Sequence, residues 1–384
     1  MPLSAADVIA NRLFAAGARH AFGIPGGEVL ALMDALDRAG LRVVLSRHEN
    51  CAGFMGEGAW HATGGPAVLF ATIGPGVANA VNAIANAWQD RVPMIVLTGC
   101  VPAVDAHTYT HQVFDHVALL KPVTKAAFRV EPGTAAVVVE KAVAIATSGR
   151  PGPVVLDVPI DVQREVREAW PVVPAAPQAA MAPAGAALET ARAWVAEARL
   201  PLVIAGLDVL TEGAEEDVAT FCRDRGAPLI TTYKGKGILP EFGPLSLGAA
   251  GLSPLADRVL LEIVAQADCV ICAGYDPIEM RTGWRDPFGA NQRVIDIGAE
   301  PNTHFMHQAR LNFTGSVGES LAVLGARGGT DWPPELPEAT RRALRAAYGA
   351  EADWGPAAIV DAARAALPPE TVITVDSGAH RIVL

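Results

Sequence analysis

The sequence predicts an α/β protein of two doubly wound parallel-sheet domains, followed by the first strand of a third. Short apolar runs recur along the chain, each ending in Gly, Pro or a small polar residue, and helix-length segments separate them. Strands that alternate with helices in this way pair in parallel, with helices on both faces of the sheet. The expected strands are 43–45, 67–72, 94–98 and 154–158 in the first half and 202–205, 228–232, 269–273 and 294–297 in the second.

Proline-rich connections divide the chain. Residues 171–187 read PVVPAAPQAAMAPAGAA and carry almost no charge, which is typical of an extended link between domains. A helix at 359–367 and a strand at 372–375 would open a further domain that these residues do not complete. We therefore expect a first domain at 1–168, a linker at 169–187, a central domain at 188–330, a linker at 331–355 and the start of a third domain at 356–384.

Charge and composition exclude several classes of partner. The 384 residues hold 30 Lys and Arg against 41 Asp and Glu, a formal charge of -11, so nucleic acid and anionic membrane surfaces are not expected partners. No apolar run reaches the ~20 residues that span a bilayer. The first residues lack the features of a signal peptide and the five cysteines are scattered, which predicts a protein of the reducing cytoplasm.

Two further patterns argue against a metal site and a nicotinamide site. Cys269 and Cys272 form a Cys-x-x-Cys inside an apolar run with no second ligand pair nearby, so we expect buried strand residues and no protein-held metal. The first turn of the second domain, AGLDVLTEG, lacks the Gly-x-Gly-x-x-Gly that binds a dinucleotide pyrophosphate. A nicotinamide-dependent dehydrogenase is therefore disfavoured.

Four segments of the first domain could carry chemistry. They are GIPGGE at 23–28, SRHEN at 46–50, TIGPGVAN at 72–79 and THQVFD at 110–115. Glu49 follows an expected strand, and the carboxyl ends of parallel strands are where α/β proteins bind ligands. A helix N-terminal carboxylate beside the macrodipole explains Glu49 equally well. The other three segments are, taken singly, compatible with ordinary turns or a surface loop.

Taken together and in this order, the segments resemble the pyrimidine-binding domain of thiamine-diphosphate enzymes, and among them the acetolactate synthase (acetohydroxyacid synthase large subunit) group. The matching blocks are AFGIPGGEVLALMDAL, SRHEN, ATIGPGVANAVNAIANAWQDRVPMIVLTG, KPVTKAAF and SGRPGPVVLDVPIDVQ. The blocks TTYKGKGILPE, GYDPIEMR and RVIDIGAEP are similar to the central domain of the same group. The resemblance covers nearly the whole chain.

The resemblance assigns roles to individual residues. Glu49 matches the glutamate that hydrogen-bonds N1′ of the aminopyrimidine, so that the ring's own amino nitrogen can remove the proton from the thiazolium carbon. Gln112 would reach the reacting centre. The pyrimidine slot would be lined by Pro25, Gly26, Thr72, Pro75 and Asn79.

Departures from the family pattern limit what the resemblance implies. Gln112 stands between His111 and Val113 where the family has Phe-Gln-Glu, which leaves the donor and acceptor substrates open. The central blocks differ from those of FAD-containing members, so FAD is not expected. In the family, a Gly-Asp-Gly block and an Asn hold Mg²⁺ and the diphosphate, and neither occurs in the sequence. We expect these ligands in the missing part of the third domain.

The function implied is an acetolactate synthase-like reaction. The enzyme would decarboxylate a 2-oxo acid such as pyruvate and ligate the two-carbon unit to an acceptor. A benzaldehyde lyase-like or 2-oxo acid decarboxylase activity is the alternative within the enzyme class, and a catalytically silent fragment is the alternative outside it, because half of the cofactor site is missing and the chain alone should be inactive. The family builds its sites between subunits, which implies a homodimer or homotetramer.

Overall fold

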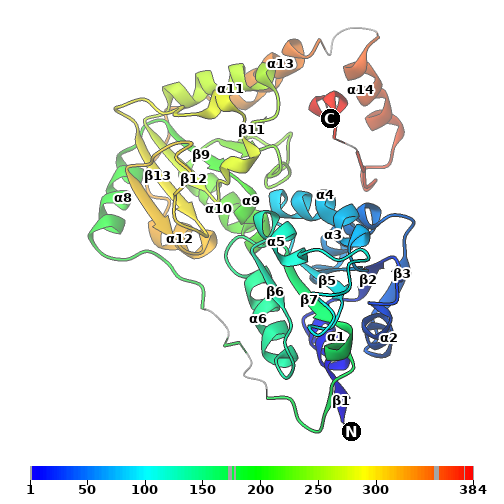
Figure 1. The fold of residues 1–384 in the computed structure, drawn as a ribbon. Coiled ribbons are helices and arrows are strands. Elements are labelled where there is room, and N and C mark those ends of the chain that lie inside the picture. The colour runs from blue at the N-terminus through cyan, green and yellow to red at the C-terminus, as the bar shows by residue number, and fades with distance from the viewer. Residues whose placement is uncertain (1, 172–174, 177–178, 350–353, 376, 384) are drawn as a thin grey trace. The chain divides into compact units, whose positions relative to one another are not determined.

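The computed structural model describes residues 2–171, 175–176, 179–349, 354–375 and 377–383. The chain forms two compact units, Met1–Gln178 and Ala179–Leu384 (Figure 1).

The first unit is built on a six-stranded sheet in the order β3-β2-β4-β5-β7-β6, in which every pair of neighbours is parallel. A separate antiparallel pair joins β1 to β8. The strands are β1 (Leu3–Ser4), β2 (His20–Gly23), β3 (Arg42–Leu45), β4 (Ala67–Ala71), β5 (Met94–Cys100), β6 (Ala126–Arg129), β7 (Val154–Pro159) and β8 (Val166–Arg167).

Helices cover both faces of this sheet. One core packs α1, α2 and α6 against one face, and a second core packs α3 and α4 against the other. The helices are α1 (Ala5–Ala15), α2 (Leu30–Arg38), α3 (Glu49–Thr63), α4 (Pro75–Gln89), α5 (His116–Leu120), α6 (Ala135–Thr147) and α7 (Ile160–Gln163), with a 3₁₀ turn η1 (Lys121–Val123).

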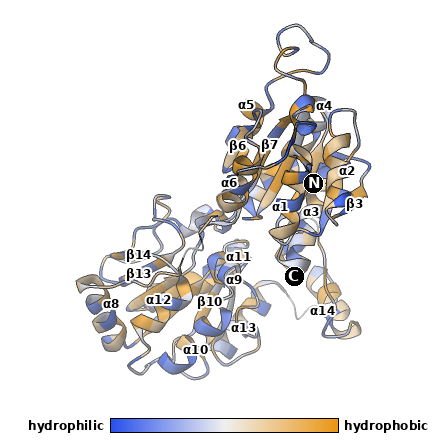
Figure 2. Ribbon diagram, turned by 90° about the horizontal axis from the view of Figure 1, so that it is seen from below, coloured by the Kyte–Doolittle hydropathy of each residue, from blue (hydrophilic) through white to orange (hydrophobic). Residues whose placement is uncertain are grey.

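Local sequence explains why these elements form where they do. β4, β5 and β7 are buried along their whole length, as expected for central strands of a parallel sheet, and Figure 2 colours most of β7 as hydrophobic. Helix α1 begins with a capping box, in which the Ser4 hydroxyl accepts from the Asp7 amide at 3.1 Å and the Asp7 carboxylate accepts from the Ser4 amide at 3.0 Å. These two signals place the sheet and its first covering helix.

The second unit repeats the architecture with a different strand order. Its six strands run β11-β10-β9-β12-β13-β14, again all parallel. The strands are β9 (Pro201–Ala205), β10 (Leu229–Thr232), β11 (Ser246–Ala250), β12 (Cys269–Ala273), β13 (Arg293–Gly298) and β14 (Leu311–Thr314).

The helices of the second unit also form two layers. Helices α8, α9, α10 and α12 contribute to one core, and α11 with the start of α13 contributes to the other. They are α8 (Ala186–Glu197), α9 (Leu207–Glu212), α10 (Glu215–Arg225), α11 (Pro254–Gln266), α12 (Val317–Leu324), α13 (Leu336–Ala347) and α14 (Pro356–Ala366), with 3₁₀ turns η2 (Pro277–Glu279), η3 (Thr282–Trp284) and η4 (Ala379–Ile382).

The two doubly wound sheets confirm the fold class predicted from the sequence. The strand predicted at 372–375 is wrong, because these residues form no strand in the structure. An extended segment becomes a strand only when a neighbour completes its ladder of hydrogen bonds, and no described segment pairs with this one. Helix α14 occupies the position of the helix predicted at 359–367, and α13 lies inside the segment expected as the second linker.

The Cys-x-x-Cys residues are buried strand residues, as predicted. Both lie on β12, and Cys269 belongs to one core of the second unit while Cys272 belongs to the other. Residues three apart on a strand point to opposite faces, so the two thiols cannot share a metal ion. Burial raises the pKa of Cys269 to about 12.

No helix in the described ranges combines the length and the apolar composition required to cross a membrane.

Candidate cofactor site

The carboxyl ends of β2, β3 and β4 bring together most of the residues predicted for the site. Pro25 and Gly26 follow β2, and Glu49 opens α3 shortly after β3. Thr72 follows β4, and Pro75 is the first residue of α4. Because neighbouring parallel strands end at the same edge of a sheet, segments separated by up to about fifty positions along the chain meet there.

Glu49 is a buried carboxylate with acceptor capacity to spare. Its residue exposure is 5%, and the Asn79 side-chain amide donates to its Oε2 at 3.0 Å. A carboxylate can accept about four hydrogen bonds, and in the part of the chain that the structure describes no cation pairs with Glu49. Its position as the first residue of α3 places it at the positive end of the helix dipole. Glu49 is thus held by the fold and open to a hydrogen-bonding ligand.

Two glycines allow the backbone to pack closely against Thr72 and this carboxylate. A Cβ on Gly76 would lie 3.2 Å from Glu49 Oε1 and 3.1 Å from Thr72 Cγ2, and a Cβ on Gly26 would lie 2.1 Å from Thr72 Oγ1. Side chains at these positions would therefore meet Thr72 and, at Gly76, Glu49 itself. The four residues form a continuous patch whose backbone can approach a flat ligand closely.

Glu28 adds a second acidic group to this patch. Its Oε2 accepts a hydrogen bond from Thr72 Oγ1 at 2.6 Å. The backbone oxygen of Glu28 accepts from Gln163 Nε2 at 2.6 Å and lies where a Cβ on Gly99 would be, which fixes the residue in place. Thr72 thus contacts Glu28 through its Oγ1 and lies next to Gly76 through its Cγ2.

Gln112 reaches the same turn through its backbone. It has a φ of 60°, and its carbonyl oxygen lies 2.2 Å from the position of a Cβ on Gly74, which itself has a φ of 63°. Glycine is the residue that tolerates both this φ and this contact. The side chain of Gln112 is exposed, so its role at the reacting centre stays a prediction.

The buried side chain of His116 accepts a hydrogen bond from the Gly74 turn. The Gly74 amide donates to His116 Nε2 at 3.0 Å, and His116 Nδ1 lies 2.9 Å from Asp157 Oδ1. Thr98 Oγ1 donates to the same carboxylate oxygen at 2.6 Å. Burial alone would raise the pKa of Asp157, but the hydrogen bonds from His116 and Thr98 hold it below its ordinary value. Asp157 is therefore an anion at neutral pH.

The sequence prediction did not include Glu28, Thr98, His116 or Asp157 among the site residues. A signal existed for two of them, because Thr98 and Asp157 interrupt otherwise apolar strands, and a polar residue in a buried strand needs a partner. Their cross-strand register places them directly opposite each other on β5 and β7. Glu28 and His116 lie in polar surroundings where sequence gives no comparable contrast.

A cavity of about 610 Å³ adjoins this network at the carboxyl ends of β5, β6 and β7. Its wall comes largely from the loop that contains Gln112. The lining residues are Ile73, Cys100, Val101, Ala106, His107, Val113, Phe114, Asp115, His116, Val117, Arg129 and Asp157.

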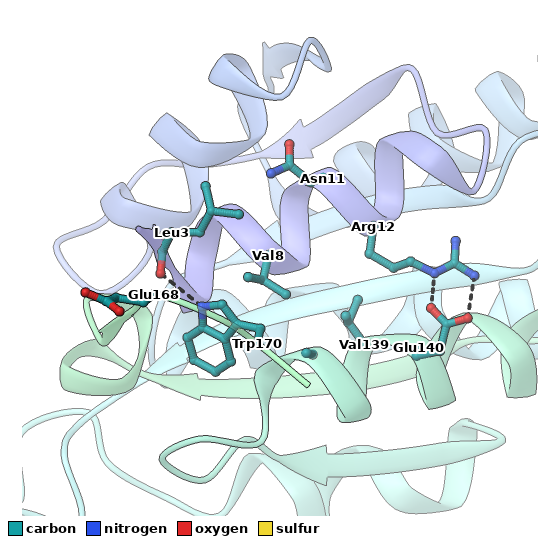
Figure 3. A pocket seen from close by; sticks show the side chains of 9 residues that line it. Leu3, Val8, Asn11, Arg12, Val139, Glu140, Glu168 and Trp170 are labelled. Carbon is teal, nitrogen blue, oxygen red and sulfur yellow. Dashed lines mark hydrogen bonds and ion pairs between the residues drawn. The ribbon is translucent and has the colours of Figure 1, made fainter. Parts of the chain in front are cut away.

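A second cavity of about 250 Å³ lies in the helical layer between α1 and α6 and holds none of the predicted site residues (Figure 3). Arg12 and Glu140 form an ion pair on its wall, and Trp170 Nε1 donates to the Leu3 carbonyl at 3.0 Å. The Arg12 hydrogen bond holds the pKa of Glu140 below its ordinary value. The ion pair ties α1 to α6, and the Trp170 bond ties the end of the first unit to β1, so both contacts are structural.

One group of potential metal ligands occurs among the described residues, and it lies in the second unit. Ligand atoms of Asp296, His304 and His307 lie within 4.8 Å of one another. Mg²⁺ prefers oxygen ligands, so this imidazole-rich group does not suit the ion that accompanies a diphosphate. Hydrogen bonds to Asp296 from His307 Nε2 at 3.1 Å and from Asn302 Nδ2 at 2.9 Å account for its burial.

The first unit thus has the features of a domain that binds a flat, polar heterocycle. The carboxylate of Glu49 is desolvated yet accepts only one hydrogen bond from the described residues, and small residues flank it. An aminopyrimidine has a ring nitrogen and an amino group at its edge and flat faces that need close backbone approach, so these residues fit that ring.

The comparisons with known proteins identify the family. Residues 3–119 match the thiamine pyrophosphate enzyme N-terminal TPP binding domain, and residues 188–324 match the thiamine pyrophosphate enzyme central domain. The chain belongs to the thiamine pyrophosphate enzyme family, and acetolactate synthase large subunits are among its relatives.

Three relatives illustrate the range of that family. The acetolactate synthase isozyme 1 large subunit of Escherichia coli is 31% identical over 98% of this chain and 68% of its own length. The probable 2-ketoarginine decarboxylase AruI of Pseudomonas aeruginosa is 31% identical over 97% of the chain and 67% of its own length. The probable acetolactate synthase large subunit of Methanocaldococcus jannaschii is 34% identical over 78% of the chain and 51% of its own length. The chain thus spans about half to two thirds of these relatives.

Proposed function

We propose that this chain provides the pyrimidine-binding and central domains of an acetolactate synthase-like enzyme, which decarboxylates a 2-oxo acid such as pyruvate and joins the two-carbon unit to an acceptor. The observation that carries the proposal is the buried carboxylate of Glu49, which is oriented by Asn79 and has acceptor positions left for a ligand. When bound, thiamine diphosphate supplies the thiazolium carbon that attacks the carbonyl and accepts the electrons released with carbon dioxide.

The chain's own residues would position and polarise the pyrimidine. Glu49 would share a proton with the ring nitrogen N1′, and Asn79 would keep the carboxylate turned toward that nitrogen. Gly26 and Gly76 let the backbone pack closely against Thr72 and Glu49, and Pro25, Thr72 and Pro75 would line the ring. Gln112 would contact the substrate. Mg²⁺ and the absence of FAD remain expectations from the resemblance.

Product analysis tests this proposal. Cofactor binding to the purified chain in the presence of Mg²⁺ is followed by calorimetry, and acetolactate formation from pyruvate is measured in an enzyme that also supplies the diphosphate-binding domain. Saturable binding that is weakened in Glu49→Gln supports the proposal. The absence of saturable binding, or binding that is indifferent to Glu49→Gln, contradicts it.

Decarboxylation without ligation is a second candidate, favoured by Glu28. Its carboxyl group accepts a hydrogen bond from Thr72, and a carboxyl group next to the substrate would suit a cationic end better than pyruvate. One relative is named a probable 2-ketoarginine decarboxylase, and a guanidinium group pairs well with a carboxylate. The test measures carbon dioxide release from 2-ketoarginine and from pyruvate, in wild type and in Glu28→Gln. Only the decarboxylase candidate predicts that Glu28→Gln lowers the rate with 2-ketoarginine more than the rate with pyruvate.

We also propose that the active assembly contains at least two copies of the chain, as the resemblance implies. Light scattering during size-exclusion chromatography measures its mass, and an active monomer would contradict this proposal.

A further inference from the structure

His116 is a neutral histidine whose protonation pattern can be deduced from its two neighbours. Its Nε2 accepts the Gly74 amide hydrogen at 3.0 Å, so this nitrogen carries no proton of its own. The proton is therefore on Nδ1, which donates to Asp157 Oδ1 at 2.9 Å. With a residue exposure of 2%, His116 has no access to solvent that could replace either bond.

The carboxylate that fixes this tautomer is itself fixed by the sheet. Asp157 lies opposite Thr98 in the parallel pairing of β5 and β7, and the Thr98 hydroxyl donates to the same Oδ1 at 2.6 Å. Arg129 Nη1 lies 3.5 Å from the other oxygen, Oδ2. The central strands of the sheet thus hold Asp157 in place, and Asp157 in turn orients the imidazole ring.

The other end of this chain of contacts is the turn of the proposed cofactor site. Gly74 is the residue before α4, directly before Pro75 and two positions after Thr72. Its positive φ and its contact with the Gln112 carbonyl leave little freedom, and the bond to His116 fixes its amide. A shift of Gly74 would move Thr72, Gly76 and Asn79 relative to Glu49.

We propose that His116 is a positioning residue for the pyrimidine slot: through the Thr98–Asp157–His116–Gly74 chain of hydrogen bonds, the rigid strands β5 and β7 hold the turn from Thr72 to Asn79 in its ligand-binding conformation. This inference rests on the proposed function, because it concerns the same slot. His116 touches neither cofactor nor substrate in this account, and its effect passes through the backbone of Gly74.

Two substitutions of His116 separate its hydrogen bonds from its volume. His116→Phe keeps a ring but removes both bonds. His116→Gln places a side-chain amide near the position of the imidazole Nε2, where its oxygen can still accept from the Gly74 amide.

The second unit offers a matched control. His307 is also buried, with a residue exposure of 1%, and its Nε2 lies 3.1 Å from Asp296 Oδ2. It belongs to the central domain, in the second unit. His307→Phe therefore disturbs a comparable buried histidine–aspartate pair without touching Gly74.

The experiment measures two quantities in the full chain: amide hydrogen exchange of a peptide that covers residues 72–77, and the dissociation constant of thiamine diphosphate with Mg²⁺. In His116→Phe we expect exchange to be faster and the dissociation constant to be higher, each by roughly 10-fold or more, because a buried amide loses its acceptor. His116→Gln should stay within about 3-fold of wild type, and His307→Phe should leave both quantities unchanged.

Unchanged exchange in His116→Phe, or a change of equal size in His307→Phe, would overturn the inference. If His116→Phe does not fold, ¹⁵N NMR of the histidine rings in wild type decides the matter: a proton on Nδ1 of His116 and none on Nε2 supports the inference, and a proton on Nε2 overturns it. The exchange measurement needs no cofactor, so a failure of cofactor binding alone contradicts the proposed function and leaves this inference to the exchange result.

Discussion

Glu49 in the first unit and Glu279 in the second are both buried carboxylates near the carboxyl ends of parallel strands, but their surroundings differ. Glu279 accepts hydrogen bonds from Thr232 Oγ1 at 2.6 Å, from the Lys234 amide at 3.1 Å and from the Leu207 amide at 3.3 Å. Among the described residues, Glu49 accepts one, from Asn79. Their exposures, 5% for Glu49 and 2% for Glu279, are similar, so burial does not explain the difference.

The difference indicates that Glu279 has a structural role and that Glu49 has free acceptor positions for a ligand. The donors around Glu279 come from the end of β10, the segment that follows it and the start of α9, so Glu279 ties these elements together. Glu49 ties only α3 to α4 and keeps acceptor positions open at the edge of the sheet. A buried charge with so few partners is costly, and proteins retain such groups mainly where function needs them.

The substitution Glu49→Gln tests the functional role of this carboxyl group. Glu49→Gln keeps the size of the side chain and can still accept a bond from Asn79, but it cannot share a proton with a ring nitrogen. In an enzyme that also supplies the diphosphate-binding domain, we expect activity to fall by roughly 10² to 10⁴-fold. The unfolding free energy of the chain should change by less than about 1 kcal/mol. Steady-state kinetics and urea unfolding measure the two effects. Retention of more than about a tenth of the activity would contradict the assignment.

Glu279→Ala should show the opposite pattern. The substitution leaves the Thr232 hydroxyl and two backbone amides without their acceptor in a buried site, which should lower the unfolding free energy by about 2–4 kcal/mol. Thiamine diphosphate affinity should not change in the fraction that remains folded. Chemical unfolding monitored by circular dichroism tests the stability, and a variant as stable as wild type would contradict a structural role for Glu279.

The pH dependence of stability gives a third contrast. Burial raises the pKa of Glu279 from 4.5 to about 7, despite the hydrogen bond from Thr232. The folded state therefore binds this proton more tightly than the unfolded state, and the resulting stabilisation is complete below pH 4.5 and is lost as the pH rises through about 7. The effect is on the order of 3 kcal/mol at most. The stability of wild type relative to Glu279→Gln should thus fall between pH 5 and pH 8, and a flat difference would contradict this account.

Substitutions at two neighbouring glycines, Gly26 and Gly27, test the packing of the slot. A Cβ on Gly26 would lie 2.1 Å from Thr72 Oγ1, whereas a Cβ on Gly27 would have no atom within 4 Å. Gly26→Ala should therefore displace Thr72, cost about 1–3 kcal/mol and weaken cofactor binding. Gly27→Ala is the matched control and should change neither quantity. Calorimetric binding constants and unfolding curves for the two variants test this, and equal effects would contradict the slot geometry.

The parts of the site that sequence could predict are those that depend on strand ends. Glu49 and Thr72 each follow an apolar run, and parallel strands finish at one edge, so their convergence follows from the fold class. The contact between Glu28 and Thr72 depends on the path of a glycine-rich turn, and the bond between His116 and Gly74 depends on how the loop that carries Gln112 folds back. No local pattern of residues predicts the course of this turn or of this loop.

The same reasoning explains the errors in the fold. The central strands were predictable because they are continuously apolar. The edge strands β6, β11 and β14 were not predicted, because they are less uniformly apolar. Val372–Val375 shows the reverse error: an apolar run has the propensity of a strand, but only a partner makes it one.

The central claim is that the carboxyl group of Glu49 pairs with a ring nitrogen of the cofactor. Calorimetry on wild type and Glu49→Gln, each with thiamine diphosphate and with an analogue in which C–H replaces N1′, measures that pairing as a coupling between the two changes. We expect the loss caused by Glu49→Gln to shrink by roughly 10-fold or more with the analogue, because the partner is already gone. Equal losses with both cofactors would mean that Glu49 and N1′ do not interact.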